Sequence, residues 1–151
     1  MTVDVSLIKN LREKTGAGVA DIREALEESS NDVKKAEEIL KEKGYARAAG
    51  KAGRETNAGL IESYVHMGRV GVLVELACET DFVARTDEFR TLAHELCLQV
   101  SSMNPKDIAA LLKQEYVRDP EKKVSDLVKE AIAKLGENIT VNRISRVELG
   151  K

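Results

Sequence analysis

The sequence predicts an α+β protein, with a head of three short helices and a core in which helices pack on a three-stranded antiparallel sheet. Three observations support this prediction. Between residues 5 and 43, apolar residues recur at spacings of three and four, as in amphipathic helices. From residue 60 to residue 78 the pattern is that of strands. The helical period returns between residues 87 and 135, before a last apolar stretch that begins at residue 139.

These patterns divide the chain into three expected parts. Residues 1–43 form the head, residues 44–57 a connector and residues 58–151 the core. About 40 residues is near the lower limit for an independent fold, so the head is small but sufficient.

The head contains three helical patterns that are separated by glycine or by small polar residues. Gly16 ends the first helix, and Gly16 and Gly18 frame a tight loop, because glycine tolerates left-handed backbone. The polar residues 29–32 end the second helix and cap the third. We expect the third helix to end at Gly44. The apolar positions are Val5, Leu7, Ile8 and Leu11 in the first helix, Val19, Ile22, Ala25 and Leu26 in the second, and Val33, Ala36, Ile39 and Leu40 in the third.

The connector is basic. No acidic residue occurs from Lys43 to Arg54, and alanine and glycine separate the basic residues. The alanines permit a helix and the glycines weaken it, so we expect a semi-ordered, solvated segment.

Two strands are predicted at residues 60–66 and 70–78, and Met67-Gly68 between them suits a tight hairpin turn. The second strand is mostly apolar on both faces, which is typical of a central strand. One face carries Val70, Val72, Val74 and Leu76, and the other carries Gly71, Leu73, Glu75 and Ala77.

Three helices and a strand follow. The first helix covers residues 87–103, Asn104-Pro105 starts a short second one that Asp119-Pro120 ends, and the third reaches Gly136. In the strand that begins at Ile139, the later apolar residues are out of phase with Val141, so we expect a bulge. The apolar stripes are Phe89, Leu92, Ala93, Leu96 and Val100 in the first helix, Ile108, Leu111 and Leu112 in the second, and Val124, Leu127, Val128, Ala131, Ile132 and Leu135 in the third.

Composition limits the function classes. The chain has 151 residues, a net charge of −2, 3% aromatic residues and no Trp, so it has neither a global attraction to nucleic acid nor many stacking surfaces. No apolar run approaches the ~20 residues of a membrane span, and no secretory signal pattern is present. Only two cysteines occur, which fits a reduced, cytoplasmic setting. No phosphate-binding or dinucleotide motif is present, so we expect no cofactor.

Residues 80–84, Thr-Asp-Phe-Val-Ala, are the most informative segment, because they lie at a strand-to-helix corner. Phe82 is one of only two phenylalanines. One interpretation places Phe82 in the core and Asp81 at a helix N-cap. The other makes the pair a probe, in which the ring inserts into a partner and the carboxylate directs it. The spacing alone leaves both open.

Residues 80–84, together with residues 11–18 (Leu-Arg-Glu-Lys-Thr-Gly-Ala-Gly), resemble the signatures of the elongation factor Ts family. The resemblance covers essentially the whole chain, and the glycine loop after the first helix resembles the ubiquitin-associated (UBA) three-helix fold. The resemblance to the elongation factor Ts family implies a non-enzymatic guanine nucleotide exchange factor that binds elongation factor Tu and promotes GDP release. The partner-binding residues that it implies are Arg12, Val19 and Ala20 in the head and Thr80, Asp81, Phe82 and Val83 at the corner.

Two departures from the family pattern bear on this prediction. Val19 and Ala20 occupy positions that are often methionine in the family, so the head contact is shaped by smaller side chains here. Long family members have two related core halves and a coiled coil, whereas this chain has room for one half. We therefore expect a homodimer, in which a second copy covers the core sheet.

Other functions fit the residues less well. A UBA-type adaptor would explain residues 1–43 but not the Asp81-Phe82 corner, and an RNA-binding module would need a basic face with aromatic residues. Two histidines and two cysteines could form a zinc set, but the spacing lacks a close cysteine pair. A cysteine nucleophile would need an orienting acid and a pocket. We expect no metal site, no catalytic residue and no direct contact with nucleic acid or membrane. The histidines and cysteines in question are His66, Cys78, His94 and Cys97.

Overall fold

The computed structural model describes residues 3–151, so the first two residues of the predicted head lie outside the described range. The head contains α1 (Val5–Thr15), α2 (Val19–Glu28) and the first part of α3 (Val33–Lys51). Asp4 caps α1 by accepting a hydrogen bond from the Ser6 backbone N–H, and Asp32 caps α3 in the same way through Lys35. The chain leaves α1 through Gly16, whose φ of 70° is left-handed. Three helices therefore form the head, as predicted.

The prediction that the third helix ends at Gly44 is wrong, because α3 continues to Lys51. Alanine is the strongest helix former, and three alanines follow Gly44 in this helix. Gly44 is accommodated because α3 packs on another helix there: a Cβ atom at position 44 would lie 3.2 Å from the Cβ atom of Ala133. Ala48 is buried in the main core. The first half of the expected connector is thus an ordered helix.

The core sheet has three antiparallel strands in the order β1 (Ala58–His66), β2 (Val70–Cys78) and β5 (Ile139–Glu148). The β1–β2 hairpin turns through Met67 and Gly68, both of which have positive φ. The pairing of β2 with β5 shifts register between Glu75 and Leu76, which confirms the predicted bulge. The central position of β2 is also confirmed.

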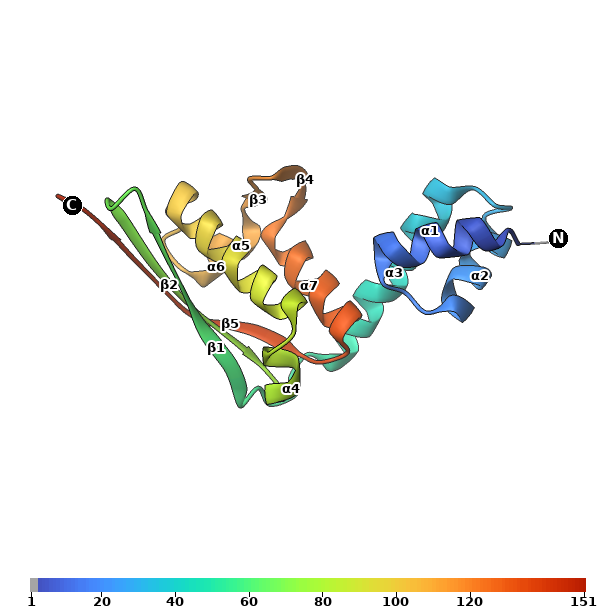
Figure 1. The fold of residues 1–151 in the computed structure, drawn as a ribbon, viewed down its shortest axis with the longest axis horizontal. Coiled ribbons are helices and arrows are strands. Elements are labelled where there is room, and N and C mark those ends of the chain that lie inside the picture. Colours follow the sequence, from blue (N-terminus) through green and yellow to red (C-terminus); the bar gives the residue numbers. More distant parts are fainter. Residues whose placement is uncertain (1–2) are drawn as a thin grey trace.

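Helices cover one face of this sheet (Figure 1). They are α4 (Asp81–Ala84), α5 (Asp87–Met103), α6 (Ile108–Lys113) and α7 (Val124–Leu135). The even-numbered residues of β2 face these helices and are buried, together with Phe89 and Leu96 of α5 and Ile132 of α7. The predicted α+β fold, with helices packed on a three-stranded antiparallel sheet, is confirmed.

The sequence pattern missed one feature in the core. Residues that we expected to continue the short helix up to Asp119-Pro120 form a two-stranded ribbon instead, β3 (Glu115–Tyr116) and β4 (Asp119–Lys123). The helix α6 is correspondingly short, and its N-cap is Asp107 rather than a residue beside Pro105.

Head and core have separate buried clusters, and α3 links them (Figure 1). Between them lies a groove of about 820 Å³, lined by the α1–α2 loop, α3, α5 and α7. Gly16 of the loop lies against α7, since a Cβ atom there would be 3.1 Å from the Lys134 side chain. Arg47, in the part of α3 that extends beyond the predicted head, forms an ion pair with Asp21 of α2. The head is therefore held against the core by a continuous helix and by the α1–α2 loop.

In residues 3–151, no helix is both long enough and apolar enough to cross a membrane.

Candidate functional site

The corner between β2 and α5 is a single turn of helix, α4, that is anchored from one side. Thr80 is its N-cap, and its Oγ1 accepts a hydrogen bond from the Val83 backbone N–H at 3.3 Å. Val83 and Ala84 are buried in the main core. Thr86 then caps α5 through the Phe89 N–H. Two threonine caps within seven residues thus make the chain turn sharply from strand to helix.

The side chain of Phe82 points away from the protein and is 82% exposed. Asp81 is exposed beside it. The interpretation that made Phe82 a core ring is therefore wrong, because Val83 and Ala84 fill the core at this turn and leave no inward position for residue 82. The exposed ring therefore contributes little to the packing of the fold.

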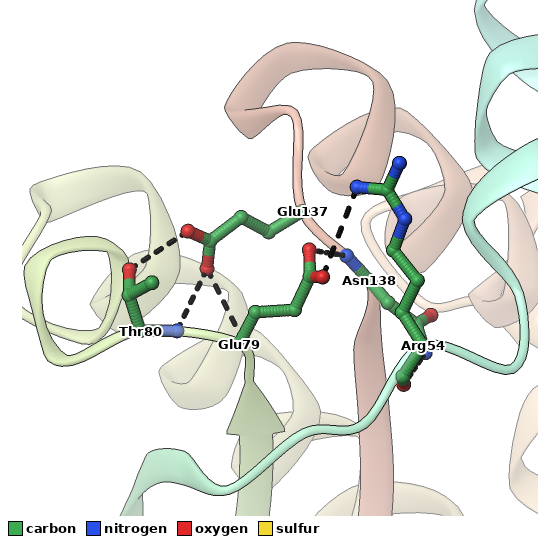
Figure 2. Close-up of polar contacts among 5 residues, drawn as sticks. All are labelled: Arg54, Glu79, Thr80, Glu137 and Asn138. Atoms are coloured by element: carbon green, nitrogen blue, oxygen red, sulfur yellow. Dashed lines mark hydrogen bonds and ion pairs between the residues drawn. The ribbon is translucent and has the colours of Figure 1, made fainter.

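A carboxylate from a distant part of the chain holds this corner (Figure 2). Glu137 follows α7, and its Oε1 accepts hydrogen bonds from the backbone N–H groups of Glu79, at 3.2 Å, and Thr80, at 3.0 Å. Its Oε2 accepts a hydrogen bond from the Thr80 hydroxyl at 2.7 Å. Sequence reasoning missed Glu137; the only local signal is an acidic residue between the helix stop at Gly136 and the buried start of β5.

The head residues implied by the resemblance lie on a different surface. Arg12 is exposed on α1, and Val19 and Ala20 are exposed at the start of α2. Arg12 forms no ion pair within the described part of the chain. These three residues flank the glycine loop of the head, whereas Phe82 lies at the end of the core sheet. The structure therefore brings the seven predicted residues into two groups rather than one.

The two cysteines are buried thiols. Burial, together with the nearby charge of Glu62, raises the pKa of Cys97 to about 12, and burial with the charges of Glu137 and Asp81 raises the pKa of Cys78. Both thiols therefore stay protonated at neutral pH, which makes them poor nucleophiles and poor metal ligands. Among the described residues, no group of three or more His, Cys, Asp or Glu side chains is placed to hold a metal ion.

Comparisons with known proteins show which family the chain is similar to. A family model described as Elongation factor TS matches residues 79–151, which begin at the corner and run to the end of the chain. Proteins named Elongation factor Ts from Caldanaerobacter subterraneus subsp. tengcongensis and Thermotoga neapolitana are 43% and 45% identical to this chain. The first alignment covers 99% of this chain and 98% of the relative, and the second covers 100% and 99%. A protein of the same name from Coprothermobacter proteolyticus is 42% identical, with all of both chains covered.

This chain is shorter than those relatives. The alignment with the Caldanaerobacter protein extends over 195 positions, so at least 44 of them (195 less 151) are gaps in this chain. The similarity nevertheless includes head and core together. The chain belongs to the elongation factor Ts family of translation elongation factors.

Proposed function

We propose that this protein is a guanine nucleotide exchange factor that binds elongation factor Tu and promotes the release of GDP. In this role it makes and breaks no covalent bond, so it is not an enzyme, and it works in the cytoplasm without direct contact with nucleic acid. The exposure of Phe82 carries the proposal. A ring that is 82% exposed, next to an exposed carboxylate and on a turn whose following residues Val83 and Ala84 are buried, is suited to insertion into a partner.

Exchange follows from a difference in affinity. A factor that binds the nucleotide-free partner more tightly than the GDP-bound partner weakens GDP binding, and GDP weakens the factor by the same ratio. Phe82 supplies the inserted group, and Asp81 directs it toward the partner's magnesium and phosphate site. Every 1.4 kcal/mol of preference for the nucleotide-free form lowers GDP affinity about tenfold.

Two surfaces make the contact in this proposal. Thr80, Asp81, Phe82 and Val83 form the corner, with Thr80 and Val83 fixing its backbone. Arg12, Val19 and Ala20 anchor the head. The continuous α3 fixes the distance between the two surfaces, so that docking the head delivers the corner to one place on the partner.

We also propose that the chain has three units: residues 1–43 are the head, residues 44–57 the connector and residues 58–151 the core.

We further propose that two copies of the chain associate through the helix-free face of the core sheet. Apolar side chains of all three strands are exposed on that face, which favours burial against a partner. They are Ile61 and Val65 of β1, Leu73 of β2 and Val147 of β5.

The direct test is the release of a fluorescent GDP analogue from elongation factor Tu. A small, sub-stoichiometric amount of this protein should accelerate release in excess unlabelled GDP, because one exchange factor serves many partners. Binding to elongation factor Tu without acceleration would contradict the proposal and would favour the adaptor function.

A further inference from the structure

The Glu137 carboxylate is held by three hydrogen bonds within the protein. Its two oxygens accept them from three donors, all of which belong to the two residues that precede Asp81. Hydrogen bonds to a charged acceptor are roughly twice as strong as those between neutral groups. The three donors include two backbone N–H groups that lie beyond the last pair of the β1–β2 and β2–β5 ladders.

The Thr80 hydroxyl transmits this contact to the residues around Phe82. A hydroxyl has one proton to donate, and here it donates to Glu137. Its lone pairs are then directed toward the Val83 N–H, from which it accepts. The relay therefore runs from Glu137 through Thr80 to Val83, and it fixes the backbone on both sides of Asp81 and Phe82.

The Glu79 carboxylate accepts a hydrogen bond from the residue that follows Glu137, so the two segments bind each other in both directions. Glu79 Oε2 accepts a hydrogen bond from the Asn138 backbone N–H at 3.0 Å, while the Glu79 N–H donates to Glu137. Asn138 is buried, and its Nδ2 donates to the Arg54 carbonyl oxygen at 2.9 Å. The Arg54 guanidinium lies 3.8 Å from Glu79 Oε1 (Figure 2). The end of β2, the start of β5 and the segment after α3 are thus tied together at the base of the corner.

We propose that Glu137 is a positioning residue, which holds the corner so that Phe82 projects in the orientation that meets the partner. It acts through Thr80 and touches no partner group itself. This inference rests on the proposed role of Phe82 in exchange, and two measurements separate the two ideas.

The first measurement uses the free protein. The chain has two phenylalanines, Phe82 and the fully buried Phe89, so fluorophenylalanine labelling gives two ¹⁹F resonances. In Glu137→Gln, the Phe82 resonance should shift and change its linewidth, while the Phe89 resonance stays in place. An unchanged Phe82 resonance would overturn the proposal. If Glu137→Gln unfolds the core and moves both resonances, Thr80→Val decides in the same way, because it removes the hydroxyl of the relay and keeps the shape.

The second measurement is GDP release with Glu137→Gln, Phe82→Ala and the double variant. Glu137→Gln should slow release about tenfold, corresponding to loss of roughly one charge-assisted hydrogen bond. It should cause no further loss when Phe82 is already alanine, because its effect passes through that ring. The proposal would be overturned if Glu137→Gln slowed GDP release a full tenfold in the Phe82→Ala background. It would also be overturned if Glu137→Gln alone left the rate of GDP release at the wild-type value.

The matched control is Glu121→Gln, the same chemical change on the exposed ribbon strand β4, which should leave release unchanged. If the Phe82→Ala variant promotes GDP release from elongation factor Tu at the wild-type rate, the proposed function of Phe82 is wrong. The fluorine spectra then still decide whether Glu137 positions the corner.

Discussion

The two phenylalanines show how one residue type serves two purposes. Phe89, three residues into α5, is fully buried between that helix and the sheet. Phe82 lies seven residues earlier and is the most exposed of the large apolar side chains in the described chain. Because stability depends on buried contacts, only one of the two rings contributes to the fold.

Replacement of each ring by alanine should separate these purposes. Phe89→Ala should lower the free energy of unfolding by about 3–5 kcal/mol, because it leaves a cavity in the core. Phe82→Ala should change it by less than about 0.5 kcal/mol, as for other exposed positions. Urea unfolding of both variants measures the difference. A large destabilisation by Phe82→Ala would mean that its ring packs against the protein and is not free for a partner.

The corner shows how far the site could be predicted at the residue scale. Its position between a strand and a helix follows from residues 70–103, and the residues of the corner are adjacent in the sequence. Glu137 lies 57 residues from Thr80. No local pattern connects the two, and the contact exists only because β5 pairs with β2 and brings the end of α7 to the corner.

Among the elements, the hydrogen bonds of one buried glutamine explain why the sequence pattern did not predict the β3–β4 ribbon. Gln99 of α5 is 1% exposed, and its amide nitrogen donates to the Glu115 carbonyl oxygen while its amide oxygen accepts from the Val117 N–H. The ribbon thus depends on a tertiary contact. Its own residues 119–123, Asp-Pro-Glu-Lys-Lys, have little strand propensity. Long periodic elements such as α5 and α7 were predictable because their own apolar stripes define them.

The helix α3 provides a test at this scale, because it contains two glycines in different surroundings. Gly44 faces Ala133 of α7, whereas a Cβ atom at Gly50 would meet nothing within 4 Å. Gly50→Ala should stabilise the protein by up to about 1 kcal/mol, through helix propensity alone. Gly44→Val should destabilise it by about 1–3 kcal/mol, because the added side chain overpacks the α3–α7 contact.

Thermal unfolding of the two variants measures both effects, and Gly50→Ala is the control for the change of backbone entropy. If Gly44→Val is as stable as the wild-type protein, α3 does not pack on α7 at this point. The head would then be free to move relative to the core.

At the scale of the whole molecule, the sheet is covered by helices on one face only (Figure 1). Leu73 lies at the middle of the central strand on the other face and is 49% exposed. If two copies associate there, light scattering at micromolar concentration should give twice the chain mass of 16.6 kDa.

Leu73→Glu should convert that dimer to the monomer, because it places a charge in an apolar interface. Met103→Glu is the matched control, since Met103 is also 49% exposed but lies at the end of α5 on the helical side. A wild-type mass near that of one chain would rule out the dimer at this concentration.

We propose that the exposed ring of Phe82 drives nucleotide release. The most direct measurement is the rate of GDP release from elongation factor Tu at saturating concentrations of the wild-type protein and of Phe82→Ala. Aromatic anchors of interfaces cost about 2–4 kcal/mol on truncation, so the variant should release GDP roughly 30- to 1000-fold more slowly. Met67→Ala, which removes an equally exposed side chain at the opposite end of β2, should retain the wild-type rate. If a folded Phe82→Ala variant accelerates GDP release from elongation factor Tu as much as the wild-type protein does, the ring does not drive exchange.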